Sequence, residues 1–319
     1  MPTPTVNSNF TGEHAGKYIN AALQSGSTIG NEEITILPNV RYKTNVTRLT
    51  LGNVIADATC NFTDSSSLAL DDREIAPKEM QVNLSICKQD LLDSWEALQM
   101  GFSAYKEIPQ NFTDYLLAYV GEKVGAEAEN YIWTGAAGTS GQFGGFDPIL
   151  VAGDTSIPSG QKINPGVPVA VTSSVVLARL GAMLDALPTS LYGKNDLRFY
   201  VAPNVARAYM RVLGGFASGG VGANGYQNEG SVGFKPLNFD GIDMVMCPGL
   251  TASTMLLTRK SNLFFGTGLM NDWQEARVLD MADITGSNNY RVIMRFSAGT
   301  QIGILEDLVL DGLGQAPAP

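Results

Sequence analysis

The residues that most often carry out acid–base or nucleophilic chemistry are few in this sequence. His14 is the only histidine, and it lies in a weakly patterned N-terminal stretch. A Ser-His-Asp or Cys-His site would depend on that one side chain. The sequence favours a solvated His14 over a catalytic one, so we predict no catalytic residue and a protein that is not an enzyme.

The cysteines do not point to a metal centre. Cys60, Cys87 and Cys247 are odd in number and far apart. With a single histidine beside them, they cannot give the ligand spacing of a tetrahedral zinc site. They are typical of reduced cysteines in a cytoplasmic protein, and we predict no metal.

Two glycine-rich stretches, 135–145 and 214–233, resemble phosphate-binding loops only in composition. Neither contains GxxxxGK followed by Ser or Thr, and neither gives GxGxxG between a strand and a helix. We therefore predict no nucleotide or other cofactor. Both stretches are interpreted as tight turns or flexible loops.

A short charged run is the remaining candidate for chemistry. Asp71, Asp72 and Glu74 surround Arg73. Adjacent residues on a strand point to opposite faces, so Asp71 and Asp72 would not converge as a hydrolytic pair. The run is better interpreted as a solvated hairpin tip or a charged contact to another subunit, and we predict the inter-subunit contact.

Composition excludes several other functions. The net charge is −10 and no run of Lys and Arg occurs, which argues against a DNA-reading protein. The N-terminus has no signal-peptide pattern, and no apolar run is long enough for a transmembrane helix. Charged residues are only 16% and glycines number 35, which indicates that much surface is hidden in a core or in subunit contacts.

The elements that position these residues centre on one long helix, predicted over 111–134. Its apolar residues recur every three or four positions; they are Phe112, Leu116, Tyr119, Val120, Val124, Ala128 and Tyr131. We predict Asn111 as the N-cap, a polar opposite face that includes Glu129, and a left-handed Gly135 that ends the helix.

A long hairpin is predicted before this helix. The segment VTRLTL forms one strand, and the period-two alternation of Val82, Leu84 and Ile86 forms the return strand. The tip would lie around 64–73. A lone hairpin is marginal in water, so we expect it to lie on a neighbouring subunit.

A compact α/β unit is predicted over 166–272. It contains a helix that starts near Val176, the strand LRFYVA and a helix with Pro203 in its first turn. The glycine-rich loop 214–233 interrupts it, and further strands follow. The last long strand, Tyr290–Ile304, alternates arginines with apolar residues.

These parts, in this order, resemble the major capsid proteins of tailed bacteriophages, whose fold was first described for the Hong Kong phage. The stretch AEAENYIWTGAAGTSGQFGGFDPIL resembles the family's glutamate, apolar pair and glycine-rich turns; its matching residues are Glu129, Ile132, Gly135, Gly138, Gly145 and Phe146. FYVAPNVARAYMRV resembles the family's strand, Asn-Pro and helix, with the dipeptide reversed. FDGIDMVMCPGL and NNYRVIMRFSAGTQIG resemble the strands that follow.

The resemblance implies an α+β, Hong Kong phage-type capsid fold. Its parts would be an N-terminal arm (1–30), an extended hairpin loop (31–88), a peripheral domain with the spine helix (89–165), an axial domain (166–272), and peripheral return strands with a tail (273–319). Gly219, Gly220, Gly222 and Gly225 would form a loop toward the capsomer axis. Lys43 and Lys78 flank the hairpin, but nothing favours either as a crosslinking residue.

The implied function is a structural protein that self-assembles into pentamers and hexamers, forming an icosahedral shell around packaged double-stranded DNA. Its partners would be other copies of itself, with separate scaffold, portal and decoration proteins and non-specific proximity to DNA, and no membrane. Its location would be the virion capsid, assembled in the host cytoplasm. The alternatives are an encapsulin-like nanocompartment shell and a soluble α/β hydrolase.

Overall fold

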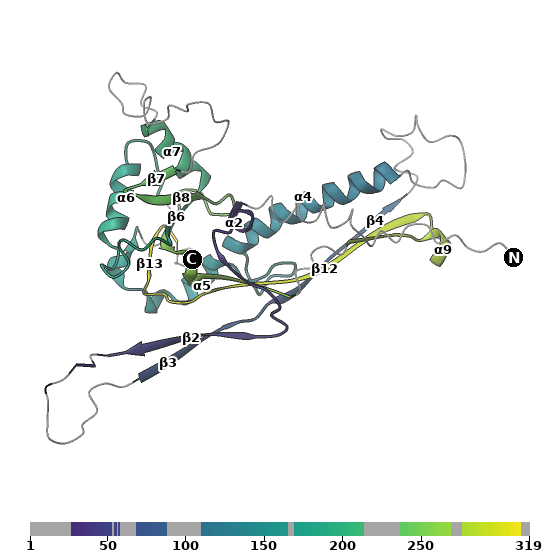
Figure 1. Ribbon diagram of the computed structural model, residues 1–319. Helices are drawn as coiled ribbons and strands as arrows, with labels where there is room; N and C mark the ends of the chain where they lie inside the picture. The colour runs from purple at the N-terminus through teal and green to yellow at the C-terminus, as the bar shows by residue number, and fades with distance from the viewer. Residues whose placement is uncertain are drawn as a thin grey trace.

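The structure is a computed structural model that describes residues 27–52, 54–55, 57, 68–87, 110–164, 169–213, 237–268 and 276–313. Figure 1 shows an elongated molecule. A sheet with helices forms one end, a long helix and long strands run toward the other, and a thin hairpin projects from the body. The predicted arm before residue 27 and the loop 214–233 lie outside the described residues.

Helix α4 (Gln110–Thr134) is the predicted spine helix. It begins at Gln110, so Asn111 lies within the helix instead of capping it. Its 25 residues span about 37 Å. One face is buried, as the apolar spacing predicted; its described members include Leu117, Val120, Val124, Ala128 and Ile132.

The end of α4 is formed by close backbone packing. Gly135 N donates to the Tyr131 carbonyl at 3.0 Å, and Gly145 N donates to the Gly135 carbonyl at 2.7 Å. The predicted left-handed conformation of Gly135 is wrong, because its φ is not positive. Glycine is needed there for a different reason: a Cβ atom would overlap the Phe143 carbonyl oxygen.

An elongated sheet is built around β12 (Asn289–Ile302). One edge of β12 pairs with β4 (Lys78–Cys87), and the other pairs with β10 (Leu263–Thr267) and then β11 (Ala276–Asp280), all antiparallel. β1 (Thr35–Leu37) extends the sheet by pairing in parallel with β10. The short helices α2 (Ser27–Gly30) and α9 (Ala282–Thr285) lie near its two ends.

The second sheet has six strands in the order β5-β13-β9-β6-β8-β7. These are β5 (Lys162–Ile163), β13 (Leu308–Asp311), β9 (Met255–Arg259), β6 (Leu197–Val201), β8 (Ile242–Met246) and β7 (Leu237–Phe239). Helices α6 (Val176–Asp185) and α7 (Pro203–Leu213) pack with it through buried faces that include Leu180 and Val205. Both helices were predicted, including Pro203 at the first position.

Sheet membership differs from the predicted boundaries in two places. β10 was placed in the axial unit but pairs with β12 in the elongated sheet. β13 was placed among the peripheral return strands but pairs with β9 and β5 in the six-stranded sheet. The chain therefore crosses between the two sheets near Asn262 and again after Ile302. Strands that are neighbours in sequence can join different sheets, because each strand joins the sheet that contains its hydrogen-bonding partner.

The projecting hairpin consists of β2 (Thr44–Leu51) and β3 (Leu68–Ile75). The predicted return strand was wrong, because residues 78–87 pair with β12 instead. Val82 and Ile86 therefore pack against the main core, which explains their alternation.

A short helical connection joins α4 to the six-stranded sheet. It contains α5 (Phe146–Ala152) and the 3₁₀ turns η1 (Asp154–Ser156) and η2 (Ser159–Gln161); a third turn, η3 (Lys260–Asn262), links β9 to β10. Trp133 lies at the junction, with ring centroids 5.3 Å from Phe146 and 5.6 Å from Tyr200. One continuous apolar core thus runs through both parts of the molecule.

Candidate assembly surfaces

The hairpin β2–β3 exposes apolar side chains along its length. Leu49 pairs across the ribbon with Leu70, and Leu51 pairs with Leu68. Leu49 and Leu70 are each 60% exposed and Leu68 is 54% exposed. The ribbon extends well beyond the body (Figure 1). An isolated two-stranded ribbon with exposed leucines is a surface suited to burial against another molecule.

The charged run predicted as a hairpin tip lies in β3, toward the base of the hairpin. Asp71 pairs with Arg48 in the strand register, and Asp72 pairs with Thr47. Glu74 forms an ion pair with Lys43 at 2.6 Å, and Arg73 Nη1 donates to the Ile302 carbonyl at 3.2 Å. Half of the run thus anchors the hairpin to its own chain, and Asp71 and Asp72 are exposed.

Lys78 has an internal structural role. Its Nζ donates to three backbone carbonyls of the loop after α4, those of Ala137, Thr139 and Gln142, at 2.8–3.1 Å. The ammonium group holds this loop against the start of β4. The other predicted positions, Gly219, Gly220, Gly222 and Gly225, lie outside the described residues.

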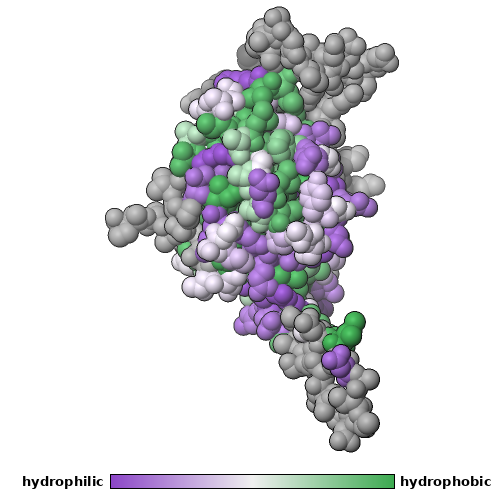
Figure 2. All heavy atoms as spheres, turned by 90° about the vertical axis from the view of Figure 1, so that its left-hand side faces the viewer, coloured by the Kyte–Doolittle hydropathy of each residue, from purple (hydrophilic) through white to green (hydrophobic). Residues whose placement is uncertain are grey.

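The end of the molecule formed by the six-stranded sheet also exposes apolar side chains. Figure 2 looks onto this end and shows hydrophobic residues gathered among polar ones. The domain's exposed apolar residues include Val169, Val175, Leu177 and Tyr192. Several of these lie at or just before the start of α6, so they form a surface at one end of the domain.

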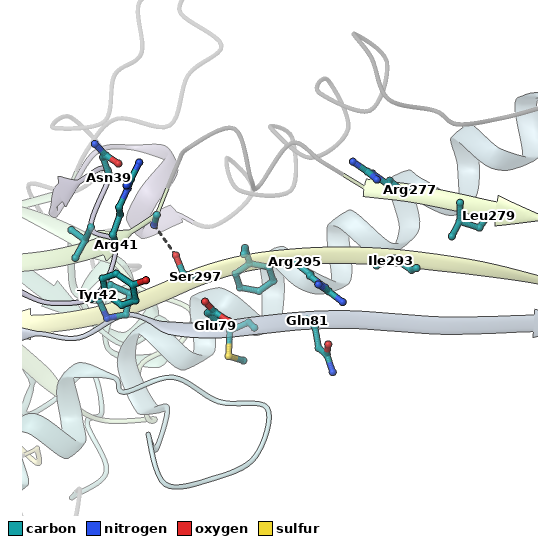
Figure 3. A pocket seen from close by; sticks show the side chains of 15 residues that line it. Asn39, Arg41, Tyr42, Glu79, Gln81, Arg277, Leu279, Ile293, Arg295 and Ser297 are labelled. Atoms are coloured by element: carbon teal, nitrogen blue, oxygen red, sulfur yellow. Dashed lines mark hydrogen bonds between the residues drawn. The ribbon is translucent and has the colours of Figure 1, made fainter.

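A pocket with both polar and apolar lining lies on the elongated sheet. It is lined by the segment after β1 and by β4, β11 and β12 (Figure 3). Arg41, Arg277 and Arg295 surround it, and Gln81 and Ser297 lie among them. Ser297 Oγ accepts a hydrogen bond from Gly268 N at 2.8 Å.

A buried polar contact, which the sequence did not reveal, joins the N-terminal segment to the spine helix. Glu129 was expected on the polar face of α4 but is 4% exposed. Its carboxylate accepts hydrogen bonds from the backbone N–H and the hydroxyl of Thr28. Trp133 Nε1 donates to Thr28 Oγ1 at 3.1 Å. Burial raises the pKa of Glu129, and the hydrogen bonds from Thr28 oppose that shift.

The Glu129 side chain is enclosed where α4 meets the loop after β8. A Cβ atom on Gly249 would overlap the Glu129 backbone carbonyl, so this glycine permits the close approach. Cys247 is also buried here, and burial raises the pKa of its thiol. The sequence shows only that Thr28 carries a hydroxyl group. It does not show that the partner of this group lies 101 residues away.

The described residues contain no group of His, Cys, Asp and Glu that could hold a metal ion. His14 and Cys60 lie outside them. No helix in the described part of the chain is long and apolar enough to cross a membrane.

The structure thus combines a six-stranded sheet with helices, an elongated sheet with a spine helix and a projecting hairpin. No family model matches the chain, and no curated protein matches it. Solved structures do match. The capsid of a native GTA particle aligns with a TM-score of 0.57 and 13% identity, over 98% of this chain and 95% of that one.

Two further structures have the same fold. The cyanophage A-1(L) capsid aligns with a TM-score of 0.58 and 13% identity, over 89% of this chain and 92% of that one. A virus-like particle from Pyrococcus furiosus aligns with a TM-score of 0.51 and 10% identity, over 92% of this chain and 98% of that one. The chain therefore has the fold of the capsid proteins in these particles, as its resemblance implied.

Proposed function

We propose that this protein is a major capsid protein, a structural subunit that assembles into pentamers and hexamers of an icosahedral shell around double-stranded DNA. The observation that carries the proposal is the capsid fold over nearly the whole chain, with a projecting hairpin that exposes Leu49, Leu68 and Leu70. A protein that functions as a monomer would leave this apolar ribbon in water.

The two exposed regions have different roles in the proposed shell. The hairpin lies on an adjacent subunit, with Asp71 and Asp72 available for charged contacts beside the leucines. Arg73 and Glu74 support it from within the chain. The domain with the six-stranded sheet faces the capsomer axis, where the apolar surface around Leu177 meets its symmetry copies. We place the loop with Gly219, Gly220, Gly222 and Gly225 toward the same axis because the resemblance implies it; these glycines lie outside the described residues.

In the proposed role the protein is not an enzyme. It assembles in the host cytoplasm and acts in the virion capsid. Its partners are further copies of itself, with portal, scaffold and decoration proteins as separate chains. The lysines beside the hairpin have internal partners: Lys43 pairs with Glu74, and Lys78 binds three carbonyls. We propose no covalent crosslink through them.

A second candidate is an encapsulin-like nanocompartment shell, which encloses protein cargo instead of DNA. The match to the virus-like particle from Pyrococcus furiosus supports the nanocompartment as a second candidate. Electron microscopy and nucleic-acid assay of particles purified from the native source separate the two. DNA-filled particles support the capsid, and nucleic-acid-free particles that contain an enzyme support the nanocompartment.

A further inference from the structure

The outer face of the elongated sheet carries an unusual set of arginines. Along β12, Tyr290, Val292, Met294 and Phe296 are buried in the core, and the alternate residues point outward. Arg291 and Arg295 are exposed on that outward face. Because strand side chains alternate, these two arginines lie on the same face, about 13 Å apart along the strand.

Two neighbouring segments add to this face. Arg277 of β11 pairs in register with Ile293, between the two arginines of β12. Arg41, which follows β1, lines the same pocket as Arg277 and Arg295 (Figure 3). We call Arg41, Arg277, Arg291 and Arg295 the arginine face. Four arginines from three separate segments of the chain are thus brought to one surface.

The charge of this surface contrasts with that of the whole chain, whose net charge is −10. Glu79 is the only carboxylate among the residues that line the pocket. Arg41, Arg291 and Arg295 form no ion pair with any described residue. Elsewhere, Arg48, Arg179 and Arg259 each pair with a carboxylate of their own chain.

We propose that the arginine face contacts the phosphodiester backbone of double-stranded DNA without reading its sequence. Guanidinium groups bind phosphate oxygens in a bidentate geometry, and the exposed guanidinium groups of Arg41, Arg291 and Arg295 are available for that bond. Gln81 supplies an amide donor. Ser297 Oγ already accepts from Gly268 N, which leaves its hydroxyl hydrogen to donate to a phosphate.

The shape of the surface fits a backbone contact. The arginines of the face lie on strands β11 and β12 of the elongated sheet and on the segment after β1, so none of them lies on a helix that could enter a DNA groove. Base reading requires an element in a groove, whereas phosphate contacts need only donors on an open surface. Tyr42, 84% exposed beside Arg41, adds a hydroxyl donor at the edge.

The competing occupant is the hairpin of a second copy. That hairpin exposes Asp71 and Asp72, but these adjacent residues of β3 point to opposite faces of the ribbon, so either face would bring only one of them to the arginines. The face with Asp72 would also carry Leu68 and Leu70. A phosphodiester backbone presents negative charge alone, and the observations favour it.

The test compares two charge reversals of equal size. Arg291→Glu with Arg295→Glu alters the arginine face. Arg207→Glu with Arg211→Glu is the matched control, since these exposed arginines of α7 have the same spacing in sequence and form no ion pair with a described residue. Binding of the purified full chain to a short fluorescent DNA duplex is measured by anisotropy over a series of salt concentrations. Circular dichroism confirms that both variants are folded.

The arginine-face variant is expected to bind DNA at least about tenfold more weakly at low salt, and to lower the slope of log affinity against log salt by about two. The control variant is expected to keep the slope of the wild type and to lose less affinity than the arginine-face variant. Its remaining loss comes only from the change in the net charge of the chain. Equal losses in both variants, or no loss in the first, would overturn the proposal.

This proposal rests on the proposed enclosure of DNA, but the two can fail separately. If the arginine-face variant binds DNA normally and no longer assembles, the face is a protein contact and the DNA proposal is wrong. If the wild type binds DNA through this face and forms no shell under any condition, the shell proposal fails and the DNA contact stands.

Discussion

At the scale of single residues, the most informative group is the Thr28–Glu129–Trp133 contact. It fastens the segment before the hairpin to the end of the spine helix through three hydrogen bonds. All three side chains are buried, so water cannot replace a lost partner. The contact therefore fixes the direction in which the chain enters the fold.

Replacing Thr28 by Val keeps the shape of the side chain and removes its hydroxyl. Glu129 and Trp133 then each lose a partner in a buried site, and we expect a loss of about 1–3 kcal/mol in the free energy of unfolding. Denaturant unfolding measures this loss. Thr134→Val is the control, because Thr134 is exposed and bonds only to its own helix, so its change should stay within about 0.5 kcal/mol.

The raised pKa of Glu129 predicts a specific pH dependence. The folded state holds the Glu129 proton more tightly than the unfolded state, whose pKa is near the ordinary 4.5. The contribution of Glu129 to stability is therefore fully present below about pH 4.5 and is lost as pH rises through its folded-state pKa. Glu33 and Asp311 also have raised pKa values and add to the same trend, because burial is the largest cause at each.

The variant Glu129→Gln removes one titrating group from this trend. Its free energy of unfolding, measured from pH 4 to 8, should fall less steeply with pH than that of the wild type. The comparison uses the slopes, because the amide also changes the hydrogen bonds to Thr28. Identical slopes in the two proteins would show that Glu129 does not titrate differently on folding.

The glycines after α4 allow a matched comparison. Gly135→Ala places a methyl group against the Phe143 and Tyr131 carbonyl oxygens, whereas a Cβ atom on Gly138 meets no atom within 4 Å. We expect a loss of about 1–3 kcal/mol for Gly135→Ala and little change for Gly138→Ala, by thermal unfolding. Similar melting temperatures for the two variants would contradict the close approach seen here.

At the scale of elements, the sequence predicted helices better than strand partners. The spacing of Val120, Val124 and Ala128 on α4 is a local pattern, and it identified part of the buried face. Leu117 and Ile132, which are also buried, were not in the predicted set. Alternation in β4 identified a strand but could not name its partner, because β12 lies about 200 residues away and pairs with it through non-local hydrogen bonds. The same limit misplaced β10 and β13.

Predictions of burial failed where a polar side chain found a distant partner. Periodicity placed Glu129 on the polar face of α4, and only the packing of Thr28 and Gly249 around it accounts for its burial. The charged run at 71–74 was predicted to lie at the hairpin tip, and this position was wrong for a similar reason. Its register with β2 and the bond from Arg73 to Ile302 depend on tertiary structure.

The hairpin prediction is tested by substituting its exposed leucines. Changing Leu49, Leu68 and Leu70 to Ser should leave the melting temperature of the subunit nearly unchanged, because these side chains are exposed in the monomer. Assembly should be lost, since each leucine buried at a contact contributes about 1.5 kcal/mol or more. Velocity sedimentation measures the assembled fraction.

Ile284→Ser is the control for this variant, because Ile284 is similarly exposed, at 63%, on α9. It should assemble as the wild type does. Normal shells from the triple leucine variant would show that the hairpin does not provide a main subunit contact.

At the scale of the whole molecule, the account depends on an extended shape with one core. The Trp133 cluster joins the two sheets into a single unit, and the hairpin projects from it. Exposed apolar side chains lie both on the hairpin and on the domain with the six-stranded sheet. Association through two different surfaces of one subunit builds a closed assembly when the rotation between copies closes.

The central claim, that this chain is a shell subunit, is tested most directly by the mass of the purified protein in solution. Size-exclusion chromatography with light scattering gives that mass without a standard. The account predicts capsomer rings or much larger particles, each a multiple of the 34.0 kDa chain. A single 34.0 kDa species at high protein concentration, with or without DNA present, would contradict it.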